Sequence, residues 1–526
     1  MKRPFAGTGS LLRLALRRDR IVMPAWILMT GLVVVSMPGS LGSIYRTAAE
    51  RAAIAASMNA NSSMRALYGP VSGDSLGALT AWRIGVYGGV LAAVMSLVIV
   101  VRHTREEEET GRQEMLSAAM VGRRAPLTAA LLAALTANGL LGLLIAGGLA
   151  GQGVDGALAL GLAVAGTGML FATTAALAAQ LTESARAAKG ITAAVLGAAF
   201  VLRAAGDAGQ AAGGSALTWA SPLGWLENVR AFADTGERWW VLGLLAAAVA
   251  VQALLGYALA GRRDVGMSFL PGRPGPAEGR LGSAGALARR LQRGSAAGWG
   301  AGFLLAGLVF GGMADGAADL VGGNERTREI FERMGGQTDL TEAFLASVTG
   351  LLGLVAALYA VSSVLRLHGE ETGQRAEWLL AAPVSRLAWA GGHLAVAFGG
   401  AAGILALGGL GIGLGHGADV AGAVGAALAQ LPAVWLIGSV AVLLHGALPR
   451  YAPAAWAVAG IVLALGWIGP ALNLPQAVLN LSPFAHLPRL PGTADPSWTP
   501  LLLLTALAAA VTAAGLAALR RRDMTG

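Results

Sequence analysis

The stretch that decides the fold runs from Thr80 to Arg124 and reads TAWRIGVYGGVLAAVMSLVIVV, followed by RHTREEEETGRQEMLSAAMVGRR. Its first part is an apolar run of about 20 residues, the length that a helix needs to cross the hydrocarbon core of a bilayer. Its second part holds four consecutive glutamates, Glu106 to Glu109, in a chain of which only 13% is charged. A membrane-spanning helix that ends in a charged loop is therefore the expected building unit.

The composition of the whole chain supports this assignment. The 526 residues are 55% hydrophobic and 13% charged, whereas a soluble domain carries about 25% charged residues. The weak alternation of a membrane β-barrel is absent. We therefore predict an all-α integral membrane protein. The chain has no cysteine and only six scattered histidines, which excludes thiolate chemistry and argues against a metal site.

Apolar runs of spanning length recur along the chain. We predict twelve spans, at residues 21–41, 80–101, 127–150, 157–180, 189–205, 239–260, 298–318, 345–365, 387–411, 420–447, 453–470 and 499–519. Arginines gather in every second connection, so the positive-inside rule places both termini in the cytoplasm of a bacterial plasma membrane. An amphipathic elbow precedes span one at residues 11–20, and residues 287–293 echo it before span seven. The long outer loops after spans one and seven are predicted to form helical caps.

The second half of the chain repeats the first. A second acidic loop, RLHGEETGQRAEWLLAAPVSR, occupies residues 366–386, and SPLGWLEN from Ser221 returns as SPFAHLPR from Ser482. Each half also ends its sixth span with Arg-Arg-Asp, at 262–264 and 521–523. We predict a parallel duplication: a six-helix half at 1–265, a cytoplasmic Pro/Gly-rich linker at 266–285 and a second six-helix half at 286–526.

The two acidic loops align with each other. Glu108-Glu109-Thr110-Gly111 matches Glu370-Glu371-Thr372-Gly373, and one inserted residue then brings the following helices into register. Each loop has a short polar segment, then a glycine, then a Leu/Ala-rich segment. This order is typical of a cytoplasmic helix whose apolar face docks in a groove on a partner. For one loop alone, a solvated connection is the simpler interpretation. The preservation of both loops favours a pair of docking helices for a twofold partner.

The chain lacks the means to power transport itself. Every Asp and Glu is predicted in a loop or at the end of a span, whereas an ion-coupled transporter ordinarily needs a buried carboxylate. Arg83 and Arg203 are expected toward outer span ends, where they can snorkel to water. The phosphate-loop pattern is missing, because Lys189 is followed by glycine and Lys2 by arginine. We therefore expect no enzyme activity here, and energy for active transport would come from another subunit.

These features resemble the fused permeases of ABC type-2 exporters, in particular the actinobacterial polyketide-antibiotic and multidrug efflux permeases. The resemblance covers essentially the whole chain and rests on the tandem halves, the elbows, the acidic loops and the Ser-Pro segments. It implies ATP-driven export of hydrophobic or amphipathic small molecules. It further implies two copies of a separately encoded ABC ATPase, which would hold ATP and Mg, while this chain binds no cofactor and no nucleic acid.

The resemblance also assigns roles to residues of the two acidic loops and of the Ser-Pro segments. The ATPase-coupling residues would be Glu106, Glu107, Glu108, Glu109, Gly111, Arg112, Glu114, Leu116, Arg123, Glu370, Glu371, Gly373, Arg375, Glu377, Leu379 and Arg386. The outer-gate residues would be Ser221, Pro222, Ser482 and Pro483. For the Ser-Pro segments the alternative is an ordinary helix start with a serine cap and a proline in the first turn.

Two other functions compete with an ABC permease. An ion-coupled secondary transporter would also have six-plus-six repeats, and a non-transporting assembly subunit would also need docking loops. The absence of predicted intramembrane carboxylates counts against the first, and the duplicated pathway-like architecture counts against the second.

Overall fold

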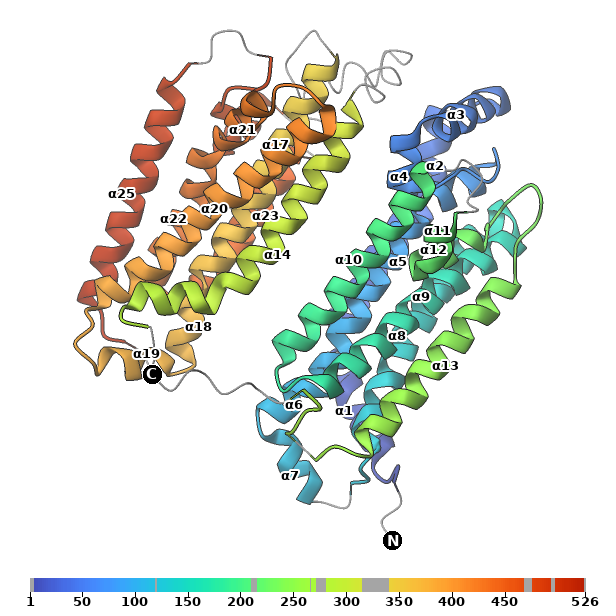
Figure 1. The fold of residues 1–526 in the computed structure, drawn as a ribbon, viewed down its shortest axis with the longest axis horizontal. Coiled ribbons are helices and arrows are strands. Elements are labelled where there is room, and N and C mark those ends of the chain that lie inside the picture. The colour runs from blue at the N-terminus through green and yellow to red at the C-terminus, as the bar shows by residue number, and fades with distance from the viewer. Residues whose placement is uncertain are drawn as a thin grey trace. The chain divides into compact units, whose positions relative to one another are not determined.

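The computed structural model describes residues 4–118, 121–209, 215–264, 266–270, 281–314, 340–467, 475–492 and 497–524. All regular elements within these ranges are helices. The chain divides into two compact units, residues 1–274 and 275–526, and each is described by itself (Figure 1). The division falls inside the segment that the sequence marks as a linker.

The first unit contains a short elbow, the spans and several small helices. Its helices are α1 (Thr8–Arg18), α2 (Val22–Ile44), α3 (Ala48–Ala60), α4 (Ser62–Tyr68), α5 (Leu76–Arg102), α6 (Arg105–Glu109), α7 (Arg112–Ala118), α8 (Ala125–Leu149), η1 (Ala150–Gln152), α9 (Val154–Leu181), α10 (Ala185–Gly209), α11 (Ala216–Ala220), α12 (Pro222–Asn228) and α13 (Trp240–Ala260).

The second unit is also helical throughout the regular elements that the structure describes. Its described helices are α14 (Ala284–Gly312), α17 (Leu340–Val364), α18 (Arg366–Thr372), α19 (Arg375–Leu380), α20 (Arg386–His416), α21 (Val420–Leu428), α22 (Leu431–Ala447), η2 (Pro449–Ala454), α23 (Ala455–Trp467), α24 (Gln476–Leu479), η3 (Pro483–His486) and α25 (Thr499–Arg521).

Eleven helices of the described residues are long and apolar enough to cross a membrane. They coincide with eleven of the twelve predicted spans. The other predicted span, 453–470, corresponds to α23, which has 13 described residues, and its continuation lies outside the described part of the chain. The structure therefore confirms an all-α membrane protein, whereas the count of twelve stays a prediction.

The two units differ in how they begin. In the first unit, residues 19–21 separate the elbow α1 from the first span α2. In the second unit the predicted elbow at 287–293 is continuous with its span, in the single helix α14 of 29 residues. The predicted outer cap after span one is confirmed as helical by α3 and α4. Most of its counterpart after span seven lies outside the described residues.

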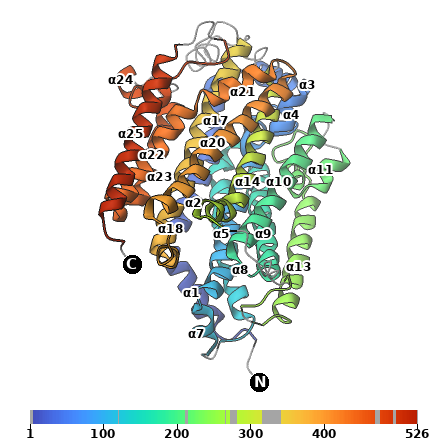
Figure 2. The same cartoon turned by 60° about the vertical axis from the view of Figure 1, so that its left-hand side comes forward.

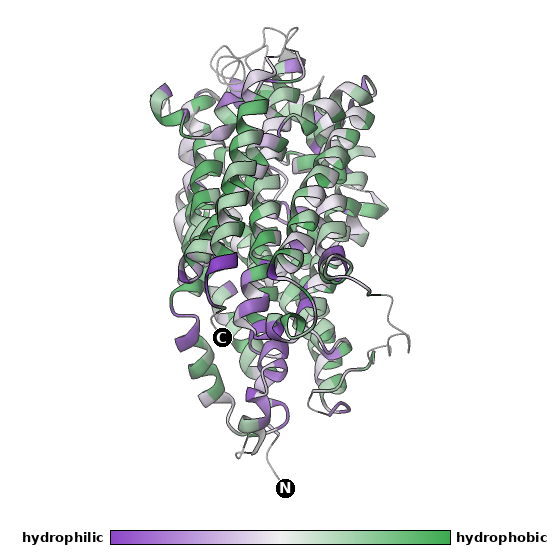
Figure 3. Cartoon of the chain, turned by 90° about the vertical axis from the view of Figure 1, so that its left-hand side faces the viewer, coloured by the Kyte–Doolittle hydropathy of each residue, from purple (hydrophilic) through white to green (hydrophobic). Residues whose placement is uncertain are grey.

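Within the first unit the short helices gather at opposite ends of the spans. In two views α1 and α7 lie at one end, whereas α3, α4 and α11 lie at the other (Figures 1 and 2). Hydrophobic residues occupy most of the length of the spanning helices, and hydrophilic residues gather toward their ends (Figure 3). We call the end that carries α6 and α7, or α18 and α19, the acidic-loop end of its unit.

Glycines bring α14 and α20 into backbone contact in the second unit. A Cβ on Gly307 would lie 2.2 Å from the carbonyl oxygen of Gly408, and one on Gly411 would lie 2.3 Å from that of Leu304. Small residues permit this close approach, which drives helix association in lipid through van der Waals packing.

This contact allows a matched test of packing. Gly307→Ala is expected to destabilise the second unit by about 1–3 kcal/mol because the added methyl group overpacks the interface. Gly302→Ala on the same helix meets open space and is expected to be neutral or slightly stabilising. Thermal unfolding of the purified chain in detergent measures both effects, and equal melting temperatures for the two variants would contradict the assignment.

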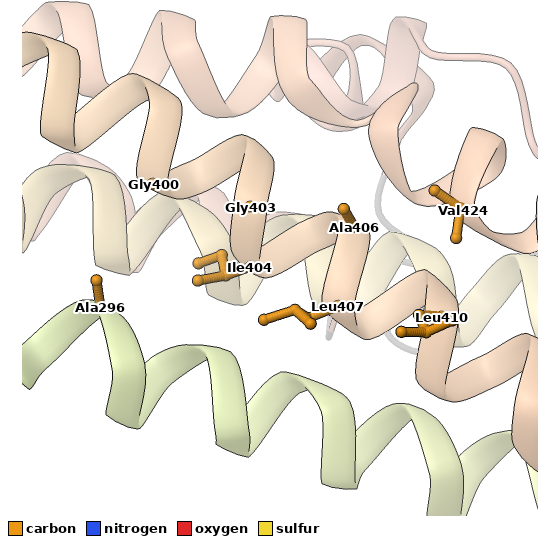
Figure 4. Close-up of a pocket in the computed structure, with 8 residues that line it drawn as sticks. All are labelled: Ala296, Gly400, Gly403, Ile404, Ala406, Leu407, Leu410 and Val424. Carbon is orange, nitrogen blue, oxygen red and sulfur yellow. The ribbon is translucent and has the colours of Figure 1, made fainter. Parts of the chain in front are cut away.

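An apolar groove of about 560 Å³ also lies along α20 in the second unit (Figure 4). Ala296 of α14 and Val424 of α21 contribute to its walls, and Gly400, Ile404 and Leu407 of α20 line it. Its walls are almost entirely hydrocarbon, so a ligand here would be held by apolar contact rather than by hydrogen bonds.

Candidate functional site

Each acidic loop folds into two short helices joined by two residues, the second of which has a left-handed backbone. In the first unit this residue is Gly111, with φ of 71°, between α6 and α7. In the second unit it is Gln374, with φ of 56°, between α18 and α19, whereas Gly373 has φ of −84°. The sequence alignment placed Gly373 opposite Gly111, so the structure shifts the repeat by one residue.

The ion pairs of the loops support the shifted register. Glu107 pairs with Arg112 at 3.1 Å, and Glu370 pairs with Arg375 at 2.9 Å. The same offset relates Glu108 to Glu371 and Arg123 to Arg386. The two loops therefore correspond without the inserted residue that the alignment required.

The four glutamates of the first loop bind groups of their own unit. Glu108 forms two bonds with Arg263, of 2.6 and 2.8 Å, and a third with Arg105 at 2.5 Å. Glu109 accepts from the backbone N–H of Ala185 at 2.7 Å, where a carboxylate is favoured by the N-terminus of α10. The remaining ion pairs are Glu106 with Lys189 and Glu107 with Arg18.

The glutamates of the second loop are also paired within their unit. Glu370 lies 2.9 Å from both Arg366 and Arg375. Glu371 forms two bonds of 2.6 Å with Arg522 and lies 3.5 Å from His445. Both carboxylates are buried. Glu371 therefore ties the loop to the residue that follows the last span, whereas Glu370 pairs within the loop. The role of these glutamates in ATPase coupling stays a prediction.

In each acidic loop the exposed residues come after the residue with left-handed backbone. Glu114 and Glu377 are exposed, and each is followed by a large apolar residue, Met115 at 70% exposure and Trp378 at 84%. Sequence reasoning missed Met115 and Trp378, although a Glu-apolar pair at the same offset in both charged loops was a usable signal. We call these exposed residues of α7 and α19 the docking faces.

The other predicted loop residues are distributed around the docking faces. Leu379 packs against the core of its own unit, so the Leu that we assigned to docking faces inward. Leu116 lies in α7, but the surroundings of its side chain lie outside the described residues. Arg123 donates to the carbonyl oxygen of Arg263 at 2.5 Å, and Arg386 to that of Arg522 at 2.6 Å.

The elbow of the first unit is tied to the end of span two. The buried carboxylate of Asp19 lies 2.6 Å from both Arg102 and His103. Burial alone would raise the pKa of Asp19, but the hydrogen bond from His103 and the positive charges of Arg102 and Arg18 outweigh it, so this pKa lies below its ordinary value.

This lowered pKa gives a pH-dependent contribution to stability. A depressed pKa in the folded state stabilises the protein above the unfolded-state pKa, about 4 for Asp, and the contribution is lost as pH falls through the lower folded value. Asp19→Asn is therefore expected to lower the melting temperature at pH 7 but to match the parent chain well below pH 4. A difference that persists unchanged in acid would contradict this pairing.

The Ser-Pro segments begin short helices. Ser221 caps α12, its Oγ accepting from the N–H groups of Leu223 and Gly224 at 3.2 and 3.4 Å, and Pro222 occupies the first turn. Ser221 also donates to the carbonyl of Ala199 in α10 at 2.6 Å. Ser482 precedes the 3₁₀ helix η3, which starts at Pro483, without a side-chain cap. The capped helix start is thus confirmed for the first segment, whereas a gating role stays a prediction.

A buried polar cluster lies beside the first Ser-Pro segment. The fully buried guanidinium of Arg203 in α10 donates to the carbonyls of Ala66 and Leu67 at 2.8 and 3.0 Å. It also lies 3.2 Å from Asp207 and 3.3 Å from Glu227. Burial, and then the neighbouring Asp207, raise the pKa of Glu227 well above its usual value. The expectation that Arg203 snorkels to water is wrong, because its partners are all internal.

A second arginine, which lies in the cap helix α4, forms the reciprocal hydrogen bonds to α10. Arg65 of α4 donates to the carbonyls of Asp207 and Ala208 at 3.0 and 2.8 Å. Each arginine thus satisfies carbonyls at the C-terminal end of the other helix, which would otherwise have no intrahelical partner. The helices of the predicted cap are thus bonded to α10 and, through the pair of Arg203 with Glu227, linked to α12.

Comparison with known proteins places the chain in a family. Residues 281–520 match the family described as "Multidrug efflux system permease Rv1217c, C-terminal domain". The multidrug efflux system permease protein Rv1217c of Mycobacterium tuberculosis is 46% identical over 532 aligned residues, which cover 99% of this chain and 96% of that protein. The chain therefore belongs to the family of the multidrug efflux permease Rv1217c.

Proposed function

We propose that this chain is the membrane permease of an ATP-driven ABC exporter, with both termini on the cytoplasmic side of a bacterial plasma membrane. Two copies of a separately encoded ABC ATPase bind the docking faces on α7 and α19 and hydrolyse ATP, while this chain catalyses no reaction. The observation that carries the proposal is the matched pair of exposed docking faces, Glu114-Met115 and Glu377-Trp378.

The surroundings of the docking faces support a mechanical role. A solvated loop that only prevents insertion would not need every glutamate before its left-handed turn to be paired with a group of the same unit. Here Glu108 and Glu371 are held by two-bond arginine pairs, which are among the strongest and most directional ion pairs in proteins. The pairs orient the loops while leaving large apolar side chains exposed, and exposed aromatic residues are the commonest anchors of protein interfaces.

The proposed substrates are hydrophobic or amphipathic small molecules that leave the cell. The printed name of the M. tuberculosis relative is that of a multidrug efflux permease, and the apolar groove along α20 offers hydrocarbon walls to such a molecule. The Ser-Pro segments at Ser221 and Ser482 are proposed as outer-gate elements. The first of them begins α12, whose Glu227 pairs with Arg203 in the polar cluster that joins the cap to α10.

The experiment that tests this function uses inside-out membrane vesicles that contain the chain and its ATPase. Uptake of rhodamine 6G, a hydrophobic fluorescent cation, is expected on addition of MgATP and is expected to stop with vanadate. A protonophore should leave this uptake intact. Uptake that requires a proton gradient and ignores vanadate would instead identify a secondary transporter, and an ATPase that copurifies without any transport would favour an assembly subunit.

A further inference from the structure

An Arg-Arg-Asp trio lies at or just after the end of the last spanning helix of each unit, and its middle arginine forms an ion pair with the acidic loop. Arg263 forms bonds of 2.6 and 2.8 Å with Glu108, and Arg522 forms two bonds of 2.6 Å with Glu371. The side chains of Arg263 and Arg522 are only 8% and 14% exposed. Water therefore screens these pairs little, and their geometry is well defined.

The main chain of the same arginine also accepts a hydrogen bond from a residue that follows the docking helix in the sequence. Arg123, which follows α7, donates to the main-chain carbonyl of Arg263, and Arg386, which follows α19, donates to that of Arg522. Each docking helix is thus tied through its preceding glutamate and its following arginine to one residue at the end of the last span.

A third contact joins the fourth span of each unit to this arginine–glutamate pair. At the end of α9, Gln180 accepts from the Nε of Arg263 at 3.0 Å. At the end of α22, His445 lies 3.5 Å from Glu371. In the first unit the fourth span thus contacts the arginine of the pair, and in the second unit it approaches the glutamate. We call each set of contacts a clamp.

The last spans bury little of their surface within the protein. α25 packs mainly on α22, where Gly446 and Gly515 bring the two backbones together. Within the most apolar 18 residues of each helix, only 17% of α13 and 11% of α25 is buried, against 67% and 78% for the second span of each unit. By contrast, the second span, which leads into the loop, is held firmly by its packing.

We propose that Arg263 and Arg522 are positioning residues that make each docking helix and the last span of its unit move as one body. A displacement that the ATPase imposes on α7 or α19 would then pass through the clamp to α13 or α25. This inference rests on the proposed function, since it takes the docking faces as the input. It assigns to the middle arginine of each Arg-Arg-Asp trio the role of the link between partner and pathway.

The absence of cysteine from the chain makes a direct test practical. A single Leu503→Cys variant places one thiol on the exposed face of α25, near the end of the helix remote from the clamp. The thiol is labelled with bimane in the complex of the full chain with its ATPase. The emission shift on addition of MgATP and vanadate reports movement of α25, while ATP hydrolysis and copurification of the ATPase are measured in parallel.

With an intact clamp the bimane emission is expected to shift when nucleotide is trapped. Adding Arg522→Gln is expected to abolish the shift, although the ATPase still copurifies and still hydrolyses ATP. Arg522→Lys keeps the charge but loses the two-bond geometry, so it should restore the shift only in part. Arg521→Gln is the matched control, because it removes the same charge from the exposed neighbour in the trio and should leave the shift unchanged.

Three results would overturn the clamp proposal. One is an unchanged shift in the Arg522→Gln variant. Another is loss of ATPase copurification in that variant, which would show that the clamp only shapes the docking face. The third is an absence of any shift in the intact complex while ATP is hydrolysed, which would leave the proposed function standing. Failure of any ATPase to copurify with the unaltered chain would instead refute the proposed function itself.

Discussion

Trp378→Asp is expected to weaken ATPase binding by about 30-fold or more and to abolish MgATP-driven uptake into inside-out vesicles. The indole is 84% exposed in α19, and removing a tryptophan anchor from an interface costs about 2 kcal/mol or more. Aspartate adds a charge that must be desolvated when the partner docks. Because the side chain has few contacts within its own unit, the fold should survive.

The control for this variant is another exposed aromatic residue at the acidic-loop end of the second unit. Tyr451 lies in η2, directly after α22, and is 65% exposed. Tyr451→Asp adds the same charge outside the docking face and should leave ATPase binding and uptake unchanged. Titration of the purified chain with the purified ATPase measures the affinity. Equal affinities for the two variants would remove Trp378 from the interface.

Arg203→Gln is expected to produce the largest loss of stability of any variant considered. Removing the guanidinium leaves the carboxyl groups of Asp207 and Glu227 and the carbonyls of Ala66 and Leu67 without their buried partner. Breaking a buried ion pair on one side costs about 3–5 kcal/mol. For a unit of this size, that corresponds to a fall in melting temperature of about 6–20 °C.

The control for Arg203 is an arginine at the same end of the first unit, opposite the acidic-loop end. Arg83 is exposed and stacks on Tyr68, its Cζ lying 4.3 Å from the ring centroid. Arg83→Gln should therefore change the melting temperature far less, since such an exposed contact contributes about 0.5–1 kcal/mol. Thermal unfolding monitored by size-exclusion fluorescence separates the two, and a stable Arg203→Gln variant would contradict the proposed locking of the cap.

Local sequence patterns were sufficient to predict the spans and the two acidic loops. Hydropathy is a property of consecutive residues, so the apolar run before Arg102 already predicts a spanning helix. The register between the loops was less secure. Thr110-Gly111 and Thr372-Gly373 look equivalent as letters, yet the left-handed turn falls at Gly111 and Gln374. The backbone conformation that matters is shared, while the residue that adopts it is not.

The partners of the charged groups could not be predicted in this way. Arg263 was recognised as part of a repeated trio, but its partner Glu108 lies 155 residues earlier in the chain. Arg203 looked like a snorkelling residue, because its acceptors in α4 lie 136 and 137 residues away. Ion pairs across helices depend on how the spans pack, and a hydropathy pattern alone does not determine that packing.

The docking faces of α7 and α19 are both proposed to bind an ABC ATPase, and site-specific photocrosslinking tests this proposal most directly. Benzoylphenylalanine is placed at Met115 or at Trp378 of the full chain, and native membranes are irradiated before mass spectrometry of the adducts. Both positions are expected to crosslink to the same ABC ATPase, whereas Tyr451, replaced in the same way, is not. Adducts with lipid alone, or with proteins that bind no nucleotide, at both positions would contradict it.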